Sequence, residues 1–244
     1  MAHGYPDYGL GSAISTLAHV VDFGEMAARV RNQTVLDRLG DVVLWEDWSR
    51  GPGFKLFHSG GGTADMALHV DPAIGPGYML RADGGGLVAP ICSASQYVTL
   101  PVRCRAGVEV EFQLDNLWGT FNVYLGYTLN GVESGCAFRF LVASSEVQVN
   151  PGGAGWLSLG VAGSLIGFLQ GWHRIKLVLD PVSNMYVRLI VDGRSYPVAV
   201  YGAQVVASVT EGMIYCFVFF EGPAVGACVA VGYIGDVTLT VNEP

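Results

Sequence analysis

The clearest alternation of apolar and polar residues lies in the middle of the chain. Residues 107–114 place valine, phenylalanine and leucine on one side and two glutamates and a glutamine on the other. Residues 172–180 alternate in the same way, and a turn at 180–184 leads into a third apolar run at 185–191. The Asp192-Gly193 pair that follows is a typical tight hairpin signal. This period of two predicts antiparallel strands that each bury one face.

Shorter apolar and β-branched runs, separated by glycine-rich turns, predict the remaining strands. Each of these runs is the length of one strand and ends at a turn signal. We expect further strands near residues 42–48, 67–70, 78–82, 95–102, 121–130, 136–143, 146–150, 196–201, 212–221, 224–233 and 237–242. About a dozen strands without a repeat predict that residues 41–244 form one all-β sandwich domain.

The first forty residues have a different character, and we expect them to form an N-terminal arm. Residues 1–16 are rich in glycine, tyrosine and serine and predict an extended segment. Asp22 and Glu25 form a capping-box-like pair, which predicts one short helix at about residues 23–31. An arm of this kind cannot fold alone, so its apolar residues are candidate oligomer contacts: Tyr5, Tyr8, Leu10, Ile14, Leu17, Phe23, Met26 and Val30.

The composition is unusually apolar for a single sandwich. Hydrophobic residues make up 51% of the chain and charged residues 14%, against about 25% charged in a typical soluble domain. Such a domain cannot bury all of this apolar surface, so the excess predicts contact with a partner. The richest run, residues 213–220, is too short for a membrane-spanning helix. Contact between copies of the chain is the simplest explanation.

The charge argues against nucleic acid as a partner. The formal net charge is −8, and Lys55 and Lys176 are the two lysines, whereas nucleic-acid binding needs clustered basic residues. The first residues lack the basic and apolar regions of a classical signal peptide. Among five cysteines, Cys216 and Cys228 flank Gly222 symmetrically. They could form a disulfide across a tight hairpin or share the core as small apolar side chains.

The sequence offers no clear catalytic or metal site. Glu109 and Glu111 project from one strand face at a spacing that carboxylate-pair hydrolysis could use, but a solvated strand face also explains them. His58 and His69 lack a recognised metal-ligand spacing, and His173 fits a structural role within a strand. We therefore expect no enzyme activity, no cofactor and no metal.

Two small groups of residues fit ligand binding. Asp180, Ser183 and Asn184 resemble a calcium-binding loop, although hairpin geometry explains them without a metal. Three aromatic residues near loops or strand ends are candidates for stacking on sugar rings, with core packing or a subunit interface as the competing explanation: Trp118, Trp156 and Tyr201.

The strand–turn–strand–hairpin unit at residues 172–193 resembles the concanavalin A-like lectin and laminin-G superfamily. Residues 44–48 look like the first strand of such domains, and residues 236–241 look like the last. The resemblance covers about 200 residues at the level of pattern. It implies an antiparallel jelly-roll sandwich in which the first and last strands lie side by side, and it brings glycan binding into consideration.

A second resemblance concerns the N-terminal segment. Residues 3–9, 22–29 and 36–42 look like a segment that precedes sandwich domains in uncharacterised proteins of thermophiles and their viruses. This resemblance implies a virion-type structural protein, such as a capsid, decoration or tail component of a virus or bacteriophage.

Two functions remain open on the sequence. The first is a non-enzymatic structural subunit that self-assembles as a homo-oligomer, with other structural proteins as partners, in a virion or extracellular assembly. The alternative is a carbohydrate-binding module or lectin, with a glycan as partner. The apolar composition and the lack of an active-site motif favour the first over the second.

Overall fold

The computed structural model describes the strands of the predicted sandwich and several of their connections. The described residues are 40–46, 55–58, 63–71, 75–84, 91–99, 104–114, 119–161, 172–209, 212–221 and 230–244. The predicted arm and helix lie outside this part of the chain, as do Trp118, Cys228 and the candidate contacts Tyr5, Tyr8, Leu10, Ile14, Leu17, Phe23, Met26 and Val30.

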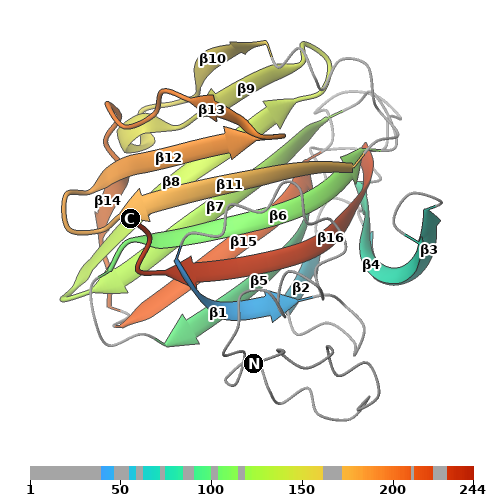
Figure 1. The fold of residues 1–244 in the computed structure, drawn as a ribbon, viewed down its shortest axis with the longest axis horizontal. Coiled ribbons are helices and arrows are strands. Elements are labelled where there is room, and N and C mark those ends of the chain that lie inside the picture. Colours follow the sequence, from blue (N-terminus) through green and yellow to red (C-terminus); the bar gives the residue numbers. More distant parts are fainter. Residues whose placement is uncertain are drawn as a thin grey trace, which may run out of the picture.

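The described strands form two antiparallel sheets that lie over one another as layers (Figure 1). Sheet I has the order β13-β12-β11-β6-β16-β4-β3, and β1 also pairs with β16. Its strands are β1 (Asp41–Glu46), β3 (Thr63–Asp71), β4 (Gly75–Gly84), β6 (Ala106–Leu114), β11 (Trp172–Asp180), β12 (Met185–Val191), β13 (Arg194–Tyr196) and β16 (Ala230–Val241).

Sheet II has the order β10-β9-β8-β7-β15-β5-β2, and β14 also pairs with β8. Its strands are β2 (Lys55–His58), β5 (Ile91–Thr99), β7 (Thr120–Leu129), β8 (Val132–Leu141), β9 (Glu146–Val149), β10 (Leu157–Val161), β14 (Gln204–Ala207) and β15 (Met213–Glu221). A short 3₁₀ turn, Pro151–Gly153, connects β9 to β10.

The position of the first and last strands confirms the expected jelly-roll sandwich. β1 pairs antiparallel with β16, with Asp41 opposite Val241 and Glu46 opposite Val237, and the two strands lie side by side in Figure 1. Consecutive strands often change sheet, as β6 and β7 do. This two-sheet antiparallel architecture is the one that the strand pattern predicts.

The core lies between the sheets and comes from alternate positions on facing strands. Val108, Val110 and Phe112 of β6 are fully buried, as the alternation predicts. Phe112 stacks on Phe121 of β7 with ring centroids 3.8 Å apart, so this pair joins the two sheets at the centre. The apolar positions of β11, including Leu177, belong to the same core cluster.

One buried hydroxyl also connects the sheets. Tyr186 of β12 in sheet I donates a hydrogen bond to the carbonyl oxygen of Asn150, at 3.1 Å, beyond the end of β9 in sheet II. Its oxygen also accepts from the backbone N–H of Ala137 in β8 at 2.8 Å. Because these partners satisfy a fully buried hydroxyl, the tyrosine ring fills core space without leaving a polar group unpaired.

Both predicted turns of the β11–β12–β13 unit are present. Asp180 Oδ1 accepts from the backbone N–H groups of Val182, at 2.8 Å, and Ser183, at 3.2 Å. Asp192 and Gly193 have φ values of 49° and 76°, the left-handed conformation that a two-residue hairpin loop needs. Hairpin geometry therefore accounts for the polar cluster that resembled a calcium loop.

Several predicted strand boundaries are wrong. The strand found near the expected 196–201 is β13, which ends at Tyr196. β16 runs from Ala230 to Val241 and so joins the described part of the strand expected at 224–233 to the strand expected at 237–242. The strands β2, β10 and β14, each four or five residues long, were not predicted. Runs this short carry too few residues to show a period.

β15 and β16 do not form the tight hairpin around Gly222 that was one of the two alternatives for Cys216 and Cys228. β15 pairs with β5 and β7 in sheet II, whereas β16 pairs with β1, β4 and β6 in sheet I. The chain therefore changes sheet between these two strands. Cys216 is buried in the core, and because Cys228 lies outside the described residues, its pairing stays a prediction.

Within the described part of the chain, we find no helix with the length and apolar character needed to cross a membrane.

Candidate functional site

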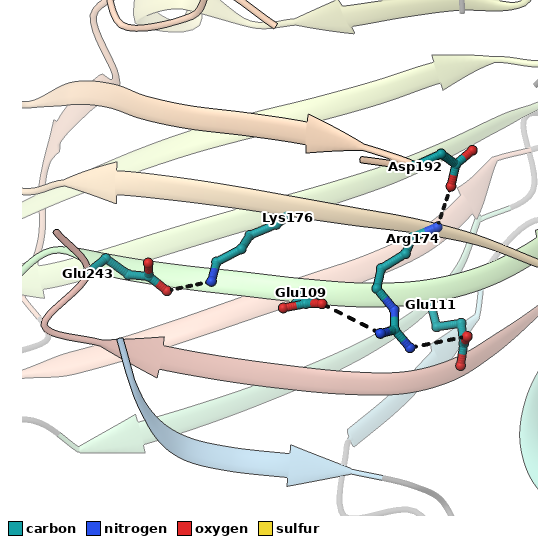
Figure 2. A network of polar contacts seen from close by, with 6 residues as sticks. All are labelled: Glu109, Glu111, Arg174, Lys176, Asp192 and Glu243. Carbon is teal, nitrogen blue, oxygen red and sulfur yellow. Dashed lines mark hydrogen bonds and ion pairs between the residues drawn. The ribbon is translucent and has the colours of Figure 1, made fainter. Parts of the chain in front are cut away.

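The two outer faces of the sandwich differ in chemistry, and the difference locates the candidate site. The outer face of sheet I carries a buried network of charges (Figure 2). Lys176 Nζ lies 2.9 Å from Glu243 Oε1, and Arg188 Nη2 lies 2.7 Å from Glu243 Oε2. Arg174 Nη2 lies 3.2 Å from Glu111 Oε1. These charges neutralise one another, so the network can be explained as a structural feature without a ligand or a catalytic role.

The solvated strand face proposed for Glu109 and Glu111 is therefore wrong. Their exposed fractions are 5% and 6%, and β11 places Lys176 opposite Glu109 and Arg174 opposite Glu111. Arg174 Nη1 lies 3.8 Å from Glu109 Oε1 (Figure 2). Both carboxylates of the candidate hydrolytic pair thus face cations of the neighbouring strand.

His173 points to the other side of β11 and has a structural contact. Its Nδ1 lies 2.8 Å from Asp192 Oδ2, while Asp192 Oδ1 accepts from the backbone N–H of Arg174 at 2.8 Å. The imidazole also lies near the ring of Phe112, with centroids 5.5 Å apart. The aspartate thus links the hairpin turn to β11, in agreement with the structural role predicted for this histidine.

The outer face of sheet II carries an aromatic cluster instead. Tyr97 of β5, Tyr124 of β7, and Tyr215 and Phe217 of β15 come together there, and we call these four residues the aromatic platform. Tyr97 and Tyr124 each stack on Tyr215, with centroids 5.4 Å and 5.9 Å apart. Phe217 meets Tyr97 edge-on at 6.2 Å. The exposed fraction of Tyr97 is 47%, so the platform is open to solvent at one end.

Two glycines make room for the platform rings. Gly126 and Gly135 face each other on β7 and β8, and Gly126 is also the cross-strand partner of Tyr215. A Cβ atom on Gly126 would overlap the Tyr215 ring, and one on Gly135 would overlap the Tyr124 ring and hydroxyl. The absence of two side chains therefore lets both tyrosine rings cover the sheet surface.

One carboxylate fixes both tyrosine hydroxyls. Glu133 of β8 accepts at Oε1 from the Tyr124 hydroxyl at 2.9 Å, and the Tyr215 hydroxyl donates to the same oxygen. Burial, followed by the Glu133 charge, raises the pKa of Tyr124. Burial and the hydrogen bond to Glu133 raise the pKa of Tyr215. Both hydroxyls thus stay protonated at neutral pH and act as donors.

Polar side chains border the platform on the same face. Asn122 lies across from Arg139 on one side and Phe219 on the other. Arg139 donates from Nε to Gln148 Oε1 at 3.0 Å, and Gln148 Nε2 donates to Glu146 Oε2 at 2.9 Å. Aromatic surface with a few placed polar groups beside it is the usual make-up of a small-molecule site.

Two of the three aromatic residues singled out in the sequence, Trp156 and Tyr201, are described, and Trp156 joins this face. Trp156 lies under the Arg139 guanidinium, whose central carbon is 4.2 Å from the indole ring centroid. Tyr201 instead packs against the core. The four platform residues were not predicted, because the run that holds two of them, residues 213–220, is almost entirely apolar. Tyr215 and Phe217 fall on alternate positions of a strand whose intervening residues are buried.

Among the described residues we find no cluster of side chains suited to bind a metal ion. No group of three or more histidine, cysteine, aspartate or glutamate side chains among them is arranged to hold one. His58 lies on β2 of sheet II and His69 on β3 of sheet I, so the two candidate histidines belong to different sheets.

The fold has counterparts among solved structures, although no family model and no curated protein matches the chain. A carbohydrate esterase from Shiga toxin-encoding bacteriophage phi24B is 12% identical, with a TM-score of 0.53 over 83% of this chain and 99% of that chain. The endo-β-1,4-glucuronan lyase of Trichoderma reesei is 10% identical, with a TM-score of 0.51 over 82% and 95%.

A third similar structure is a Bacillus subtilis protein of unknown function with a galectin-like fold. It is 9% identical, with a TM-score of 0.50 over 83% of this chain and 97% of that chain. At these identities the likeness concerns the fold alone, and the chain spans nearly the whole of each of these three neighbours.

These neighbours correct the prediction that the chain is not an enzyme. An esterase and a lyase share the fold, so a missing hydrolase motif is no ground for excluding catalysis, because one fold hosts many chemistries. The fold itself is as expected. The chain is an antiparallel jelly-roll sandwich, and its fold is similar to that of a carbohydrate esterase, a glucuronan lyase and a protein with a galectin-like fold.

Proposed function

We propose that the chain binds a carbohydrate on the outer face of sheet II. The observation that carries this proposal is the aromatic platform, with Tyr97 about half exposed beside Phe217. The C–H faces of a sugar ring are apolar, and tyrosine offers an apolar ring with a polar end, which suits a ligand of mixed polarity. Strands in a sheet lie ~4.8 Å apart, so β5, β15 and β7 span ~10 Å, enough for a short oligosaccharide.

Preorganisation supports the same proposal. The rings of Tyr124 and Tyr215 are fixed by hydrogen bonds to Glu133, and they occupy space left free by Gly126 and Gly135. A ring that is already fixed loses little conformational entropy when a ligand binds, so less of the binding free energy is lost to ordering. Of the polar residues beside the rings, Arg139 is partly exposed, whereas Asn122 and Gln148 are buried.

The proposed binding face is also compatible with catalysis, which some proteins of this fold carry out. Glu133 supplies a carboxylate next to the platform, and the two phenols whose pKa it helps to raise act as donors rather than bases. A reaction on the bound glycan would therefore use the same face as binding. For this reason we pair the binding assay with product analysis by mass spectrometry of each glycan that binds.

The test is a glycan array followed by titration calorimetry with the bound glycan. We expect Tyr97→Ala and Phe217→Ala each to weaken binding at least about tenfold, which is ~1.4 kcal/mol. Val182→Ala is the control, because Val182 is exposed in the turn between β11 and β12, two strands of sheet I, and is not one of the platform residues. Unchanged affinity in both aromatic variants, or no glycan binding at all, would remove the proposal.

A further inference from the structure

The charged groups around the platform indicate which class of glycan fits. On the described strands of sheet II, three carboxylates share the outer face with two cations. The carboxylates are Glu133, Glu146 and Glu221, and the cations are Arg139 and Lys55. The outer face of sheet II therefore has an excess of negative charge, and the whole chain is negative as well, with a formal net charge of −8. An anionic ligand would therefore approach against repulsion.

The arginine of this face is already engaged. Arg139 donates from Nε at 3.0 Å and from Nη2 at 2.5 Å to Gln148 Oε1, and its guanidinium stacks on Trp156. Burial lowers its pKa, while the negative charges of Glu221 and Glu146 act in the opposite sense. The guanidinium charge is thus balanced by two carboxylates before any ligand arrives.

A uronic acid should bind poorly beside these charged groups. Its carboxylate would have to separate Arg139 from Gln148 to form a bidentate pair, and it would then lie near Glu146 and Glu221. Like charges close together in a partly desolvated site are costly. A neutral sugar avoids this cost and still presents hydroxyls that carboxylates and amides can accept or donate to.

We infer that the ligand of this face is an uncharged glycan chain and that polyuronates are disfavoured. This inference rests on the proposed carbohydrate-binding function. It also separates the chain from the glucuronan lyase that shares its fold, because a uronate polymer is the class of ligand that the charges select against.

Affinity electrophoresis tests the inference with two panels of polysaccharides. One panel holds neutral hexose polymers, namely β-glucan, glucomannan and galactomannan, and the other holds glucuronan, alginate and polygalacturonate. At about 150 mM salt, where surface charges are screened over ~8 Å, we expect at least one neutral polymer to retard the protein and no polyuronate to do so. Stronger retardation by a polyuronate than by every neutral polymer would overturn the inference but not the proposed function. No retardation by either panel would defeat both.

A charge-neutralising variant tests the physical cause. Glu221→Gln keeps the shape of the side chain and leaves an oxygen for its 3.5 Å contact from Thr120 Oγ1. The probe is the neutral polymer that binds, compared with the same polymer after oxidation of a small fraction of its primary hydroxyls to carboxylates, so that both forms still bind measurably. We expect the variant to favour the oxidised form about threefold more than the parent protein does, the effect of one charge ~7 Å away in water. Val182→Ala should leave the ratio unchanged, and an unchanged ratio in Glu221→Gln would contradict the electrostatic account.

Discussion

The ring of Tyr215 lies over Gly126, its cross-strand partner on β7, where a methyl group would overlap it. Tyr124 covers Gly135 in the same manner. Both tyrosines lean along the sheet toward the Glu133 carboxylate. The platform therefore depends on two positions that have no side chain at all, and this dependence can be tested.

Gly126→Ala should damage the platform without removing any ring. The added methyl group must displace the Tyr215 ring, and forcing an extra carbon into a packed site costs about 1–3 kcal/mol. We expect the free energy of unfolding in urea to fall by this amount and glycan affinity to fall at least about fivefold. Gly202→Ala is the matched control, because its Cβ would make only an ordinary contact, 3.9 Å from Asn184 O. Equal effects of the two substitutions would show that the Tyr215 ring needs no such space.

Glu133 should matter as a hydrogen-bond acceptor. Glu133→Ala leaves two largely buried hydroxyls without their shared acceptor, which costs about 1–3 kcal/mol each when no water replaces it. Glu133→Gln keeps a carbonyl oxygen in the same place, so we expect a much smaller loss of stability and of glycan affinity. Urea unfolding and calorimetry measure both quantities. If glutamine is as damaging as alanine, the charge rather than the acceptor geometry holds the rings.

Three buried tyrosine hydroxyls should ionise late as the pH rises. Burial, as the largest cause, raises the pKa of Tyr124, Tyr186 and Tyr215 above the usual value near 10. The folded protein keeps these protons where the unfolded chain releases them. Their contribution to stability is therefore complete below pH ~10 and is lost as the pH rises toward the raised values.

Phenolate absorbance gives the measurement for this expectation. Of eleven tyrosines, we expect these three to stay protonated at pH ~11 while the protein remains folded, and to ionise only with unfolding. Tyr186→Phe should remove one late-titrating group. Ionisation of all eleven in a single step near pH 10, with circular dichroism unchanged, would contradict the burial of these hydroxyls.

Glu243 should be a strong determinant of stability at the outer face of sheet I. It pairs with Lys176 at 2.9 Å and Arg188 at 2.7 Å, and its own side chain is fully buried. Glu243→Ala leaves the Lys176 charge buried without this carboxylate, and removing one member of a buried pair typically costs about 3–5 kcal/mol. Arg188→Met removes the partly exposed partner instead, and we expect it to cost clearly less. Thermal and urea unfolding of both variants decide the order, and the reverse order would contradict it.

The sequence predicts the strands of the sandwich best where one face is plainly polar. In β6 and β11 the charged residues mark one side of the strand, and the buried valines and leucines mark the other. The pattern could not show that these charges face one another, because Arg174 and Glu111 lie far apart in the chain and meet only through the strand pairing. This is why a solvated face was expected where the structure has a buried ionic network.

The candidate site could not be predicted for a related reason. Residues 213–220 are almost entirely apolar, so the outward-facing Tyr215 and Phe217 cannot be told from the core residues between them by periodicity. Their partners Tyr97 and Tyr124 come from two other strands. The composition shows an excess of apolar residues, and the strand pairing shows that some of these residues lie together on the outer face of sheet II.

The most direct test of carbohydrate binding on this face is to map the bound glycan by nuclear magnetic resonance. The backbone amides of a labelled sample are followed during titration with the glycan that the array identifies. We predict the largest shift changes at Tyr97, Tyr124 and Phe217, with little change at Arg174 and Lys176 on the outer face of sheet I. Shift changes centred on sheet I, with the platform amides unmoved, would contradict the account.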